Sequence, residues 1–374
     1  MLLLCLPLLL ILIPSDANTC LKKRSDWNED KSSIPTRLVG WLDSVFTGGG
    51  EKGVKSRLYD PVTEVFSNSH GDYDEDDPEE RRVITIGTFV KNIPYGLTWQ
   101  LRSTRRLDGF LYGLVDQEGR FTGDDLTFIY PDLLTGLRGM FVNGVLQQAR
   151  AVDVVSERCA GGKKELIMEP SDNDSDVVWK KHKTNTDYIG QHPRVMDPHE
   201  MKSVHVADSK LDAEEGLFAK RIFSPGDLIS YYSGHKTYLG NIIDPNSMTD
   251  VDIVEAASYL YSLGHHAPAW WNYPRDLLLD VGVKYRSTGS YRTTLAHKAN
   301  HKFGGKNSHW DVVIHPVVGG IACLVASKEI DEGDEIYVDY NYDIDDLVPT
   351  WYTEALNSYV LESTMREQYP EYWP

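Results

Sequence analysis

The chain has 374 residues, of which 41% are hydrophobic and 11% are aromatic. This composition excludes a wholly disordered chain and supplies enough apolar surface for two or three domains with cores of their own. The 38 Lys and Arg residues stand against 56 Asp and Glu, giving a formal net charge of -18, which argues against direct nucleic-acid binding and favours a basic peptide as partner.

The N-terminus begins with an apolar run over residues 2–13, interrupted only by Pro7 and followed by a small-residue stretch that ends at Ala17. The run is shorter than the roughly 20 residues that span a bilayer, so it resembles a secretory signal peptide, and membrane association is not expected. No Lys or Arg precedes it. Two interpretations stay open, a true signal peptide or an upstream extension that is absent from the mature chain, and residues 1–20 are left out of the predicted fold.

The cysteines form no recognisable pattern. They are Cys5, Cys20, Cys159 and Cys323. None belongs to a C-x-x-C pair or lies near a pair of histidines, so neither a disulfide framework nor a structural zinc site is indicated. Cleavage after Ala17 would leave three of them, an odd number for an oxidising compartment.

Glycines recur through residues 35–150, each followed by an aromatic or large apolar residue and then by Asp or Asn. Gly87, Gly113 and Gly139 are each 26 residues apart. A short period with glycine punctuation and alternating apolar residues predicts stacked β-hairpins, none of which can bury its own face. The units resemble MORN repeats, and an irregular β-rich domain with chance glycine spacing is the alternative.

The rest of the chain divides by composition. An acidic segment at 72–82 predicts a solvated loop, residues 151–202 read as a linker with occasional strands, and the second domain covers 203–345. This domain is expected to be β-rich, with one helix running from Asp250 or Asp252 to Gly264, and residues 346–374 are expected to be mainly helical. The turn residues and apolar runs predict strands at 228–232, 312–314, 321–325 and 336–340, and a final helix over 351–362. The predicted fold class is therefore mainly β.

Four separate segments of the second domain carry aromatic, amide and glycine residues that a peptide-modifying site needs. These segments are 212–218, 297–303, 338–343 and 351–352. In this order they resemble the SET-domain lysine methyltransferases, whose signatures are a loop ending in Gly-Leu-Phe, an Asn-His segment and a late strand ending in Tyr. MORN-like repeats before a SET domain resemble the type that methylates lysine 4 of histone H3, and the likeness of a diverged member extends over most of residues 35–362.

The resemblance implies an activity and a location. It implies transfer of a methyl group from S-adenosyl-L-methionine to a lysine of the histone H3 tail or another basic peptide, without a metal, by a chromatin regulator in the nucleus or on the chromosome. The signal-like N-terminus conflicts with that location. A catalytically impaired SET-fold protein that binds peptides or serves as a scaffold is the alternative function.

The resemblance also assigns candidate residues. Tyr340 is the expected catalytic tyrosine, Tyr232 is expected to line the lysine channel and Tyr342 to wall it, and Trp310 occupies the position of a second channel tyrosine. The cofactor contacts are expected from the opening loop, the Asn-His segment and an aromatic residue that stacks on adenine. They are Ala213, Glu214, Glu215, Gly216, His297, Asn300, His301 and Trp351.

The chain departs from the family pattern at several of these positions. The opening loop reads Glu214-Glu215-Gly216 where Gly-x-Gly is usual, so a side chain enters where close backbone approach is expected. Lys302 stands where Ser commonly follows the Asn-His pair, and an acidic residue near the adenine falls on Ala355. Because indole is bulkier than phenol and cannot accept a hydrogen bond from an ammonium, Trp310 predicts that the product stops at monomethyl-lysine.

Overall fold

The structure is a computed structural model that describes residues 65–70, 83–90, 93–101, 106–160, 163–171, 176–181, 193–211, 215–243, 247–268, 271–342 and 348–368. Among these, residues 65–152 and 170–368 belong to one compact unit, and residues 153–169 belong to a second. The signal-like segment and the acidic segment at 72–82 lie outside the described residues. No helix in the described ranges is long and apolar enough to cross a membrane.

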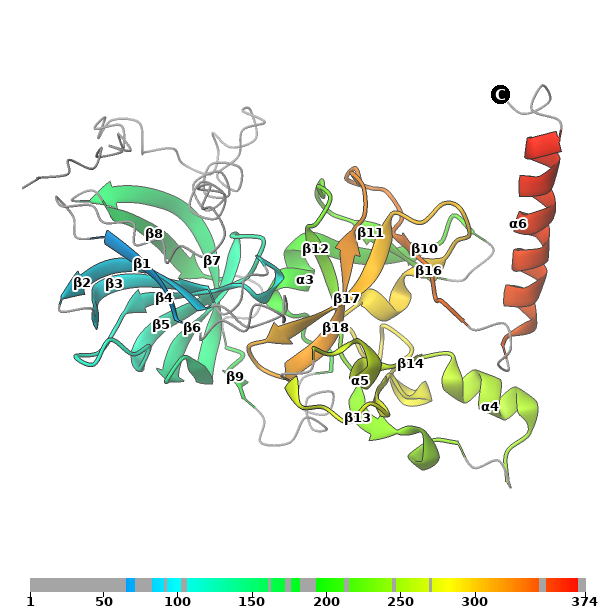
Figure 1. The fold of residues 1–374 in the computed structure, drawn as a ribbon, viewed down its shortest axis with the longest axis horizontal. Coiled ribbons are helices and arrows are strands. Elements are labelled where there is room, and N and C mark those ends of the chain that lie inside the picture. Colours follow the sequence, from blue (N-terminus) through cyan, green and yellow to red (C-terminus); the bar gives the residue numbers. More distant parts are fainter. Residues whose placement is uncertain are drawn as a thin grey trace, which may run out of the picture. The chain divides into compact units, whose positions relative to one another are not determined.

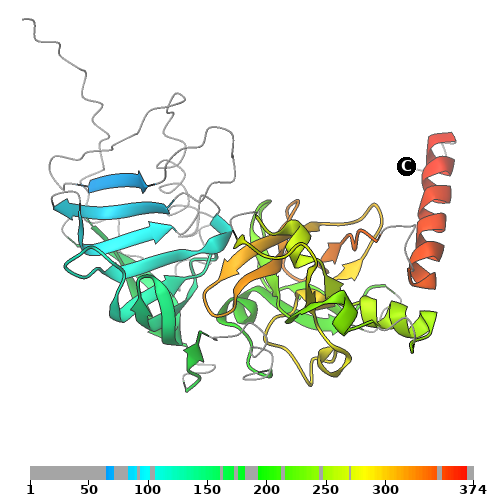
Figure 2. The ribbon, with the colours of Figure 1, turned by 60° about the horizontal axis from the view of Figure 1, so that its bottom comes forward.

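The first half of the described chain forms one sheet in which strands pair in chain order through successive hairpins (Figures 1 and 2). Its strands are β1 Val65–His70, β2 Val83–Val90, β3 Ile93–Leu101, β4 Phe110–Leu114, β5 Gly123–Ile129, β6 Thr135–Val142, β7 Val145–Ala160 and β8 Lys163–Pro170, with β9 Trp179–Lys180 paired to β7. The predicted mainly β fold with an N-terminal hairpin sheet is confirmed. β7 and β8 occupy part of residues 151–202, which the sequence predicts to be a linker. The assignment of the hairpins to MORN repeats stays a prediction.

The spaced glycines lie where neighbouring strands approach closely. Gly113 has a φ of +146°, and a Cβ atom there would lie 2.7 Å from the side chain of Leu126. A Cβ atom at Gly139 would lie 2.7 Å from the Cα atom of Ala149 on β7. Any larger residue would push these strands apart, which accounts for the glycine at both positions.

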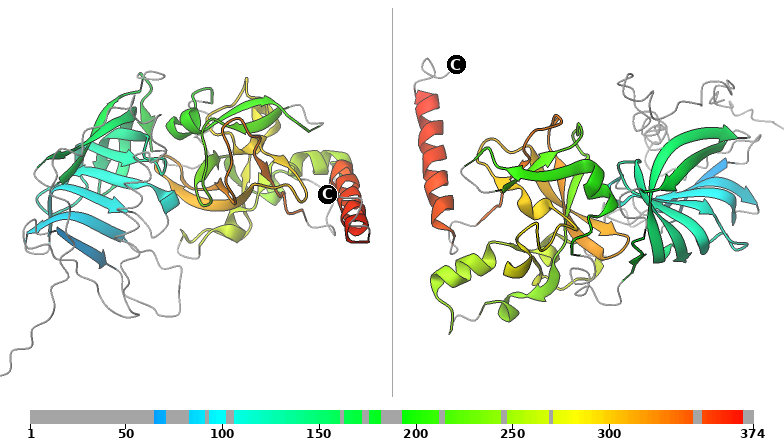
Figure 3. Two further views of the ribbon diagram at one scale, coloured as in Figure 1. Left: turned by 90° about the horizontal axis from the view of Figure 1, so that it is seen from above. Right: turned by 180° about the vertical axis from the view of Figure 1, so that it is seen from behind.

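The second half of the chain contains small sheets, seen from two sides in Figure 3. They are β10 Val204–Asp208 with β11 Glu215–Ala219; β12 Leu228–Tyr232 with β18 Gly319–Ala326 and β17 Ser308–His315; β13 His235–Tyr238 with β15 Leu277–Asp280 and β14 Leu260–Tyr261; and β16 Asn300–His301 with β19 Tyr337–Val338. The strands predicted at 228–232, 312–314 and 321–325 are confirmed, and the one predicted at 336–340 is shorter. Cys323, on β18, is a buried free thiol.

The described helices are short except for the last one. They are α3 Pro198–Ser203, α4 Asp250–Ala257, α5 Leu263–His266 and α6 Thr350–Gln368. The predicted C-terminal helix is confirmed and extends beyond residue 362. The helix predicted from Asp250 or Asp252 to Gly264 begins at Asp250, where Thr249 caps it through a capping box with Asp252, but it stops at Ala257. Leu260 then pairs with Asp280 of β15, so sheet pairing overrides the helical periodicity.

Candidate active site

A parallel pair of two-residue strands brings two of the predicted motifs together. Asn300 pairs with Tyr337 and His301 pairs with Val338, so the Asn-His segment lies beside the late strand that leads to Tyr340. The backbone N–H of Tyr340 donates to His301 Nδ1 at 3.1 Å, and the Tyr340 hydroxyl donates to the carbonyl of Ala299 at 2.9 Å. The predicted catalytic tyrosine is therefore fixed at both its backbone and its hydroxyl by the segment that carries the Asn-His pair.

The hydrogen bond to Tyr340 defines the tautomer of His301. A backbone N–H can only donate, so Nδ1 is the acceptor and the neutral ring carries its hydrogen on Nε2. Burial lowers the pKa of His301, while the carboxylate of Asp339 acts in the opposite direction. Within the described part of the chain, Nε2 is buried without a hydrogen-bond partner. The site thus contains an unpartnered buried donor next to Tyr340.

The side-chain amide of Asn300 is held by groups of the same domain. Its Nδ2 atom lies 3.1 Å from Ser209 Oγ, 3.0 Å from the carbonyl of Glu215 and 3.1 Å from Glu335 Oε1. The Glu335 carboxylate also accepts from Ser209 Oγ at 2.6 Å, from the Lys210 N–H at 2.7 Å and from the Tyr337 hydroxyl. Burial raises the pKa of Glu335, but these donors outweigh it and leave the pKa below its usual value.

Glu335 is the residue of this site that the sequence analysis missed. It directly follows Asp331-Glu332-Gly333-Asp334, which the sequence predicts to be a turn, and its side chain is buried. No local pattern in the sequence points to it. In the structure, a Cβ atom at Gly216 would lie 2.9 Å from the Glu335 carboxyl carbon. Gly216 therefore makes room for a carboxylate of the protein itself.

The remaining cofactor candidates lie in different surroundings. Glu215 forms an ion pair with Lys298 at 2.6 Å and accepts a hydrogen bond from Thr288 at 3.2 Å. The ring of His297 is buried 5.6 Å from that of Tyr291, and burial, helped by the charge of Lys298, lowers its pKa to about 3. Its role stays a prediction, as do those of the candidates Ala213 and Glu214, which lie outside the described residues.

The channel candidates form a compact aromatic cluster. The rings of Tyr232 and Trp310 meet edge to face at 5.5 Å, and Tyr261 lies 6.0 Å from the first and 5.4 Å from the second. The Tyr232 hydroxyl donates to the carbonyl of Tyr259 at 2.5 Å, and Trp310 Nε1 donates to the carbonyl of Asp339 at 3.1 Å. The indole of Trp310 is thus bonded to the residue that precedes Tyr340.

A second group of rings surrounds Tyr340. Its ring lies 5.8 Å from that of Tyr342 and 6.1 Å from that of Trp351, both edge to face. Trp351 is in the first turn of α6 and is 47% exposed, whereas Tyr352 is buried 4.9 Å from the His301 ring. Burial raises the pKa of Tyr340 and of Tyr342, so both phenols stay neutral near pH 7.

This arrangement can align a cationic or neutral amine. Because the hydroxyls of Tyr232 and Tyr340 donate to backbone carbonyls, their oxygen lone pairs remain able to accept N–H hydrogens from an incoming group. The aromatic rings beside them can also pack against an aliphatic side chain or a methylated ammonium.

Comparison with known proteins agrees with the order of these motifs. Residues 214–341 match the SET domain, so this part of the chain is similar to the SET-domain proteins. Residues 89–161 match the family described as Histone H3 K4-specific methyltransferase SET7 N-terminal, and the two matches follow one another along the chain.

A curated relative and two solved structures illustrate the similarity. The Histone-lysine N-methyltransferase SETD7 of Halocynthia roretzi is 29% identical over 258 residues, which are 66% of this chain and 61% of the relative; the chain thus spans about three fifths of that protein. The Neurospora SET domain protein DIM-5, a histone lysine methyltransferase, is 18% identical with a TM-score of 0.28, over 39% of this chain and 55% of that one. A humanized mutant of the Chaetomium thermophilum Polycomb Repressive Complex 2 is also 18% identical with a TM-score of 0.28. The match covers 39% of this chain and 16% of that one.

Proposed function

We propose that the chain is a protein-lysine N-methyltransferase that transfers a methyl group from S-adenosyl-L-methionine to a lysine of the histone H3 tail or another basic peptide. The observation that carries this proposal is the parallel pairing of β16 with β19, which puts the Asn-His segment directly beside Tyr340. The SET-domain match and the likeness to the SETD7 relative support it.

The side chains beside Asn300 fit a cofactor with an amino-acid end and an adenine. When bound, S-adenosyl-L-methionine supplies a methyl group on a positively charged sulfur. In the described part of the chain, His301 Nε2 is a buried donor without a partner and the Asn300 amide oxygen makes no hydrogen bond. We infer that Asn300, His301 and the opening loop hold the amino-acid end and that the exposed ring of Trp351 covers the adenine.

The aromatic residues have a different task, which is to present the lysine. A free lysine titrates near 10.4, so presenting its neutral amine at pH 7.4 costs about 4 kcal/mol unless the site lowers that value. In this proposal, the hydroxyl oxygens of Tyr232 and Tyr340 accept the amine hydrogens and orient the lone pair, and the surrounding rings exclude water. Alignment of this kind can supply several kcal/mol of the barrier reduction.

Trp310 is the residue that we propose limits the product. Its indole is packed against Tyr232 and Tyr261, and its single N–H donates a hydrogen bond to the carbonyl of Asp339. It therefore offers the amine no acceptor, and its second ring occupies volume that a phenol leaves open. Monomethyl-lysine is the expected product.

Charge supports the proposed class of substrate. The net charge of -18 favours encounter with a basic peptide such as the histone H3 tail. The name of the Halocynthia relative supports action on a histone, and hence a place in the nucleus.

Transfer of labelled methyl groups from S-adenosyl-L-methionine to a histone H3 tail peptide tests the proposal on the full chain. Tyr340→Phe removes the hydroxyl that donates to Ala299, and Tyr95→Phe, at a residue 63% exposed on the N-terminal sheet, is the matched control. We expect transfer by the native protein and the control, and a loss of about 100-fold in rate for Tyr340→Phe. Equal rates for both variants would refute the assigned role.

A second function, a peptide-binding scaffold that does not use the cofactor, is favoured by one observation. The Asn300 Nδ2 atom is already surrounded by three acceptors of the chain, and Glu215 is paired with Lys298. Binding of the H3 peptide by a folded protein that takes up no S-adenosyl-L-methionine would support this function and exclude the first.

A further inference from the structure

Strand β12 contains an irregularity just before the channel candidate Tyr232. Leu228 pairs with Val325 on β18 and Ser230 pairs with the adjacent Leu324, so Ile229 is an extra residue with no counterpart. An extra residue of this kind falls out of the hydrogen-bond ladder and needs other partners for its backbone groups. The carbonyl of Ile229 finds one in His199 Nε2, which lies 3.2 Å away.

Helix α3 supplies the partners for the next residues as well. Glu200 follows His199, and its carboxyl group accepts from the Tyr231 N–H at 2.6 Å and from the Ser230 hydroxyl at 2.8 Å. The side chains of His199 and Glu200 are buried. Asp197, which caps the helix and accepts from the His199 N–H at 3.0 Å, is buried as well. Two adjacent residues of α3 thus fix three consecutive residues of β12.

The two ring nitrogens of His199 contact Ile229 on one side and Asp132 on the other. A carbonyl only accepts, so Nε2 is a donor to Ile229. Nδ1 lies 3.1 Å from Asp132 Oδ2, and Asp132 Oδ1 already accepts from two backbone N–H groups, those of Leu134 and Thr135. Burial raises the pKa of Asp132, but the contacts with His199 and other donors bring it below its usual value, so Asp132 is the anion.

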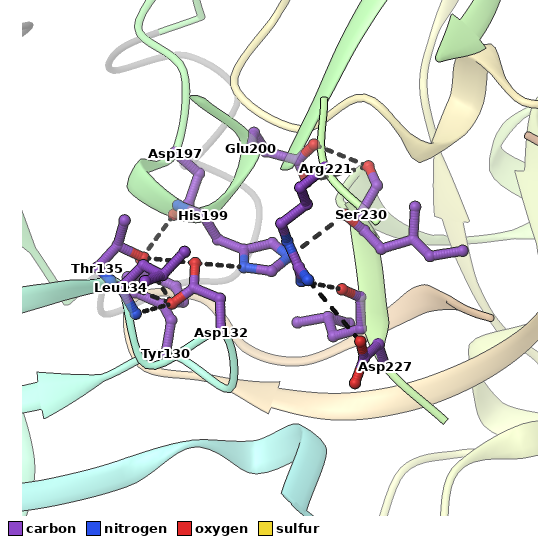
Figure 4. Close-up of polar contacts among 12 residues, drawn as sticks. Tyr130, Asp132, Leu134, Thr135, Asp197, His199, Glu200, Arg221, Asp227 and Ser230 are labelled. Carbon is purple, nitrogen blue, oxygen red and sulfur yellow. Dashed lines mark hydrogen bonds and ion pairs between the residues drawn. The ribbon is translucent and has the colours of Figure 1, made fainter. Parts of the chain in front are cut away.

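Asp132 and His199 form this pair from distant parts of the sequence. Asp132 lies in the turn between β5 and β6 of the N-terminal sheet, and His199 lies on α3, 67 residues later. Figure 4 shows His199 between Asp132 on one side and the strand that carries Ser230 on the other. The turn of the sheet therefore determines where the donor to the Ile229 carbonyl is placed.

The extra residue decides which way the tyrosines of β12 point. Side chains alternate along a strand, so removing one residue would exchange the two faces for all that follow. With Ile229 in place, Tyr231 is buried 4.9 Å from the His315 ring, and Tyr232 meets Trp310 of the proposed lysine channel. A change in the pairing at Ile229 would therefore alter the direction of the Tyr232 side chain, three residues later.

We propose that His199, oriented by Asp132, is a positioning residue that keeps Tyr232 in the lysine channel by holding the Ile229 carbonyl. The inference rests on the proposed function, because it concerns a wall of that same site. Through His199 and Ile229, the β5–β6 turn, which lies outside the matched SET region, would influence the alignment of the substrate lysine.

Two isosteric variants of the full chain separate the two ring nitrogens of His199. In His199→Gln the amide nitrogen replaces Nε2 and can still donate to Ile229, whereas in His199→Asn it replaces Nδ1 and can donate only to Asp132. With the H3 peptide as substrate, we expect kcat to fall about threefold or less for Gln but about tenfold or more for Asn, with little change in KM for the cofactor. Equal losses, or the larger loss for Gln, would overturn the proposal.

Fluorine NMR of the 3-fluorotyrosine-labelled protein gives a readout that does not depend on activity. The signal of Tyr232 is assigned by its absence in Tyr232→Phe. We expect it to shift in His199→Asn and to keep its native position in His199→Gln, which can still donate to the Ile229 carbonyl. A native signal in His199→Asn, or a displaced one in His199→Gln, would refute the positioning role. If the native protein transfers no methyl group, the proposed function fails and these spectra still decide the inference.

Discussion

The backbone N–H of Tyr340 and the imidazole Nδ1 of His301 share a hydrogen bond of 3.1 Å. Through this bond, the residue that the sequence assigns to cofactor contact also holds the backbone of the residue that it assigns to catalysis. The relationship implies that His301 has a role in stability as well as in the proposed chemistry.

Replacing His301 should therefore destabilise the fold. In His301→Ala the buried N–H of Tyr340 loses its acceptor and the ring leaves a cavity beside Tyr352, so we expect a loss of about 2–4 kcal/mol in the free energy of unfolding. His309→Ala, which removes an exposed ring bonded to Ser327, is the matched control and should cost about 0.5 kcal/mol or less. Urea unfolding measures both, and a His301→Ala variant as stable as the control would show that the bond contributes little.

Gly216 should not tolerate a methyl group. The added Cβ atom of Gly216→Ala would lie 2.9 Å from the carboxyl carbon of Glu335, whose four donors hold it in place. We expect a loss of about 1–3 kcal/mol in stability. Gly240→Ala is the control, because nothing lies within 4 Å of its added atom. Glu335→Asp should relieve part of the cost in the double variant, and an additive double variant would contradict the clash.

Trp310→Tyr should change the product. The smaller phenol leaves space beside Tyr232 and provides an acceptor in place of the indole N–H. We expect mass spectrometry to find mainly monomethyl-lysine with the native protein and additional dimethyl-lysine with the variant. Trimethylated product from the native protein would contradict the proposed role of Trp310.

His297 should make the protein sensitive to acid. Its pKa is about 3 in the folded chain against about 6.5 for an ordinary histidine, so between these values the unfolded chain binds a proton that the folded chain does not. Stability is therefore complete above pH 6.5 and falls as the pH drops, by up to about 1.4 kcal/mol per pH unit. Between pH 6.5 and 5, His297→Leu should lose about 2 kcal/mol less than the native protein. Identical losses would mean that His297 is protonated in the fold.

The sequence predicts those parts of the site that follow from local patterns. Alternation along the strand separates Tyr231, which is in the core, from Tyr232, which meets Trp310. The apolar and turn residues likewise predict the hairpin of β17 and β18 and the C-terminal helix. These features depend on residues close together in the chain.

The features that the sequence did not reveal depend on contacts between distant residues. Glu335 directly follows a predicted turn, and its place in the site is evident only when its donors Ser209 and Tyr337 are seen around it. The helix after Asp250 ends early because Leu260 pairs with a strand 20 residues away in the numbering, at Asp280. The extra residue Ile229 in β12 leaves no mark in the sequence, because only its partner strand defines it.

The groups around Asn300 should form a working cofactor site, and calorimetric titration of S-adenosyl-L-methionine into the full chain measures its affinity. Asn300→Ala removes the amide that contacts Glu215 and Glu335, while Asn241→Ala, at an exposed residue outside this site, is the control. We expect micromolar binding by the native protein and the control, and none by Asn300→Ala. A folded native protein that binds no S-adenosyl-L-methionine would contradict this expectation and leave the peptide-binding scaffold as the function of this SET domain.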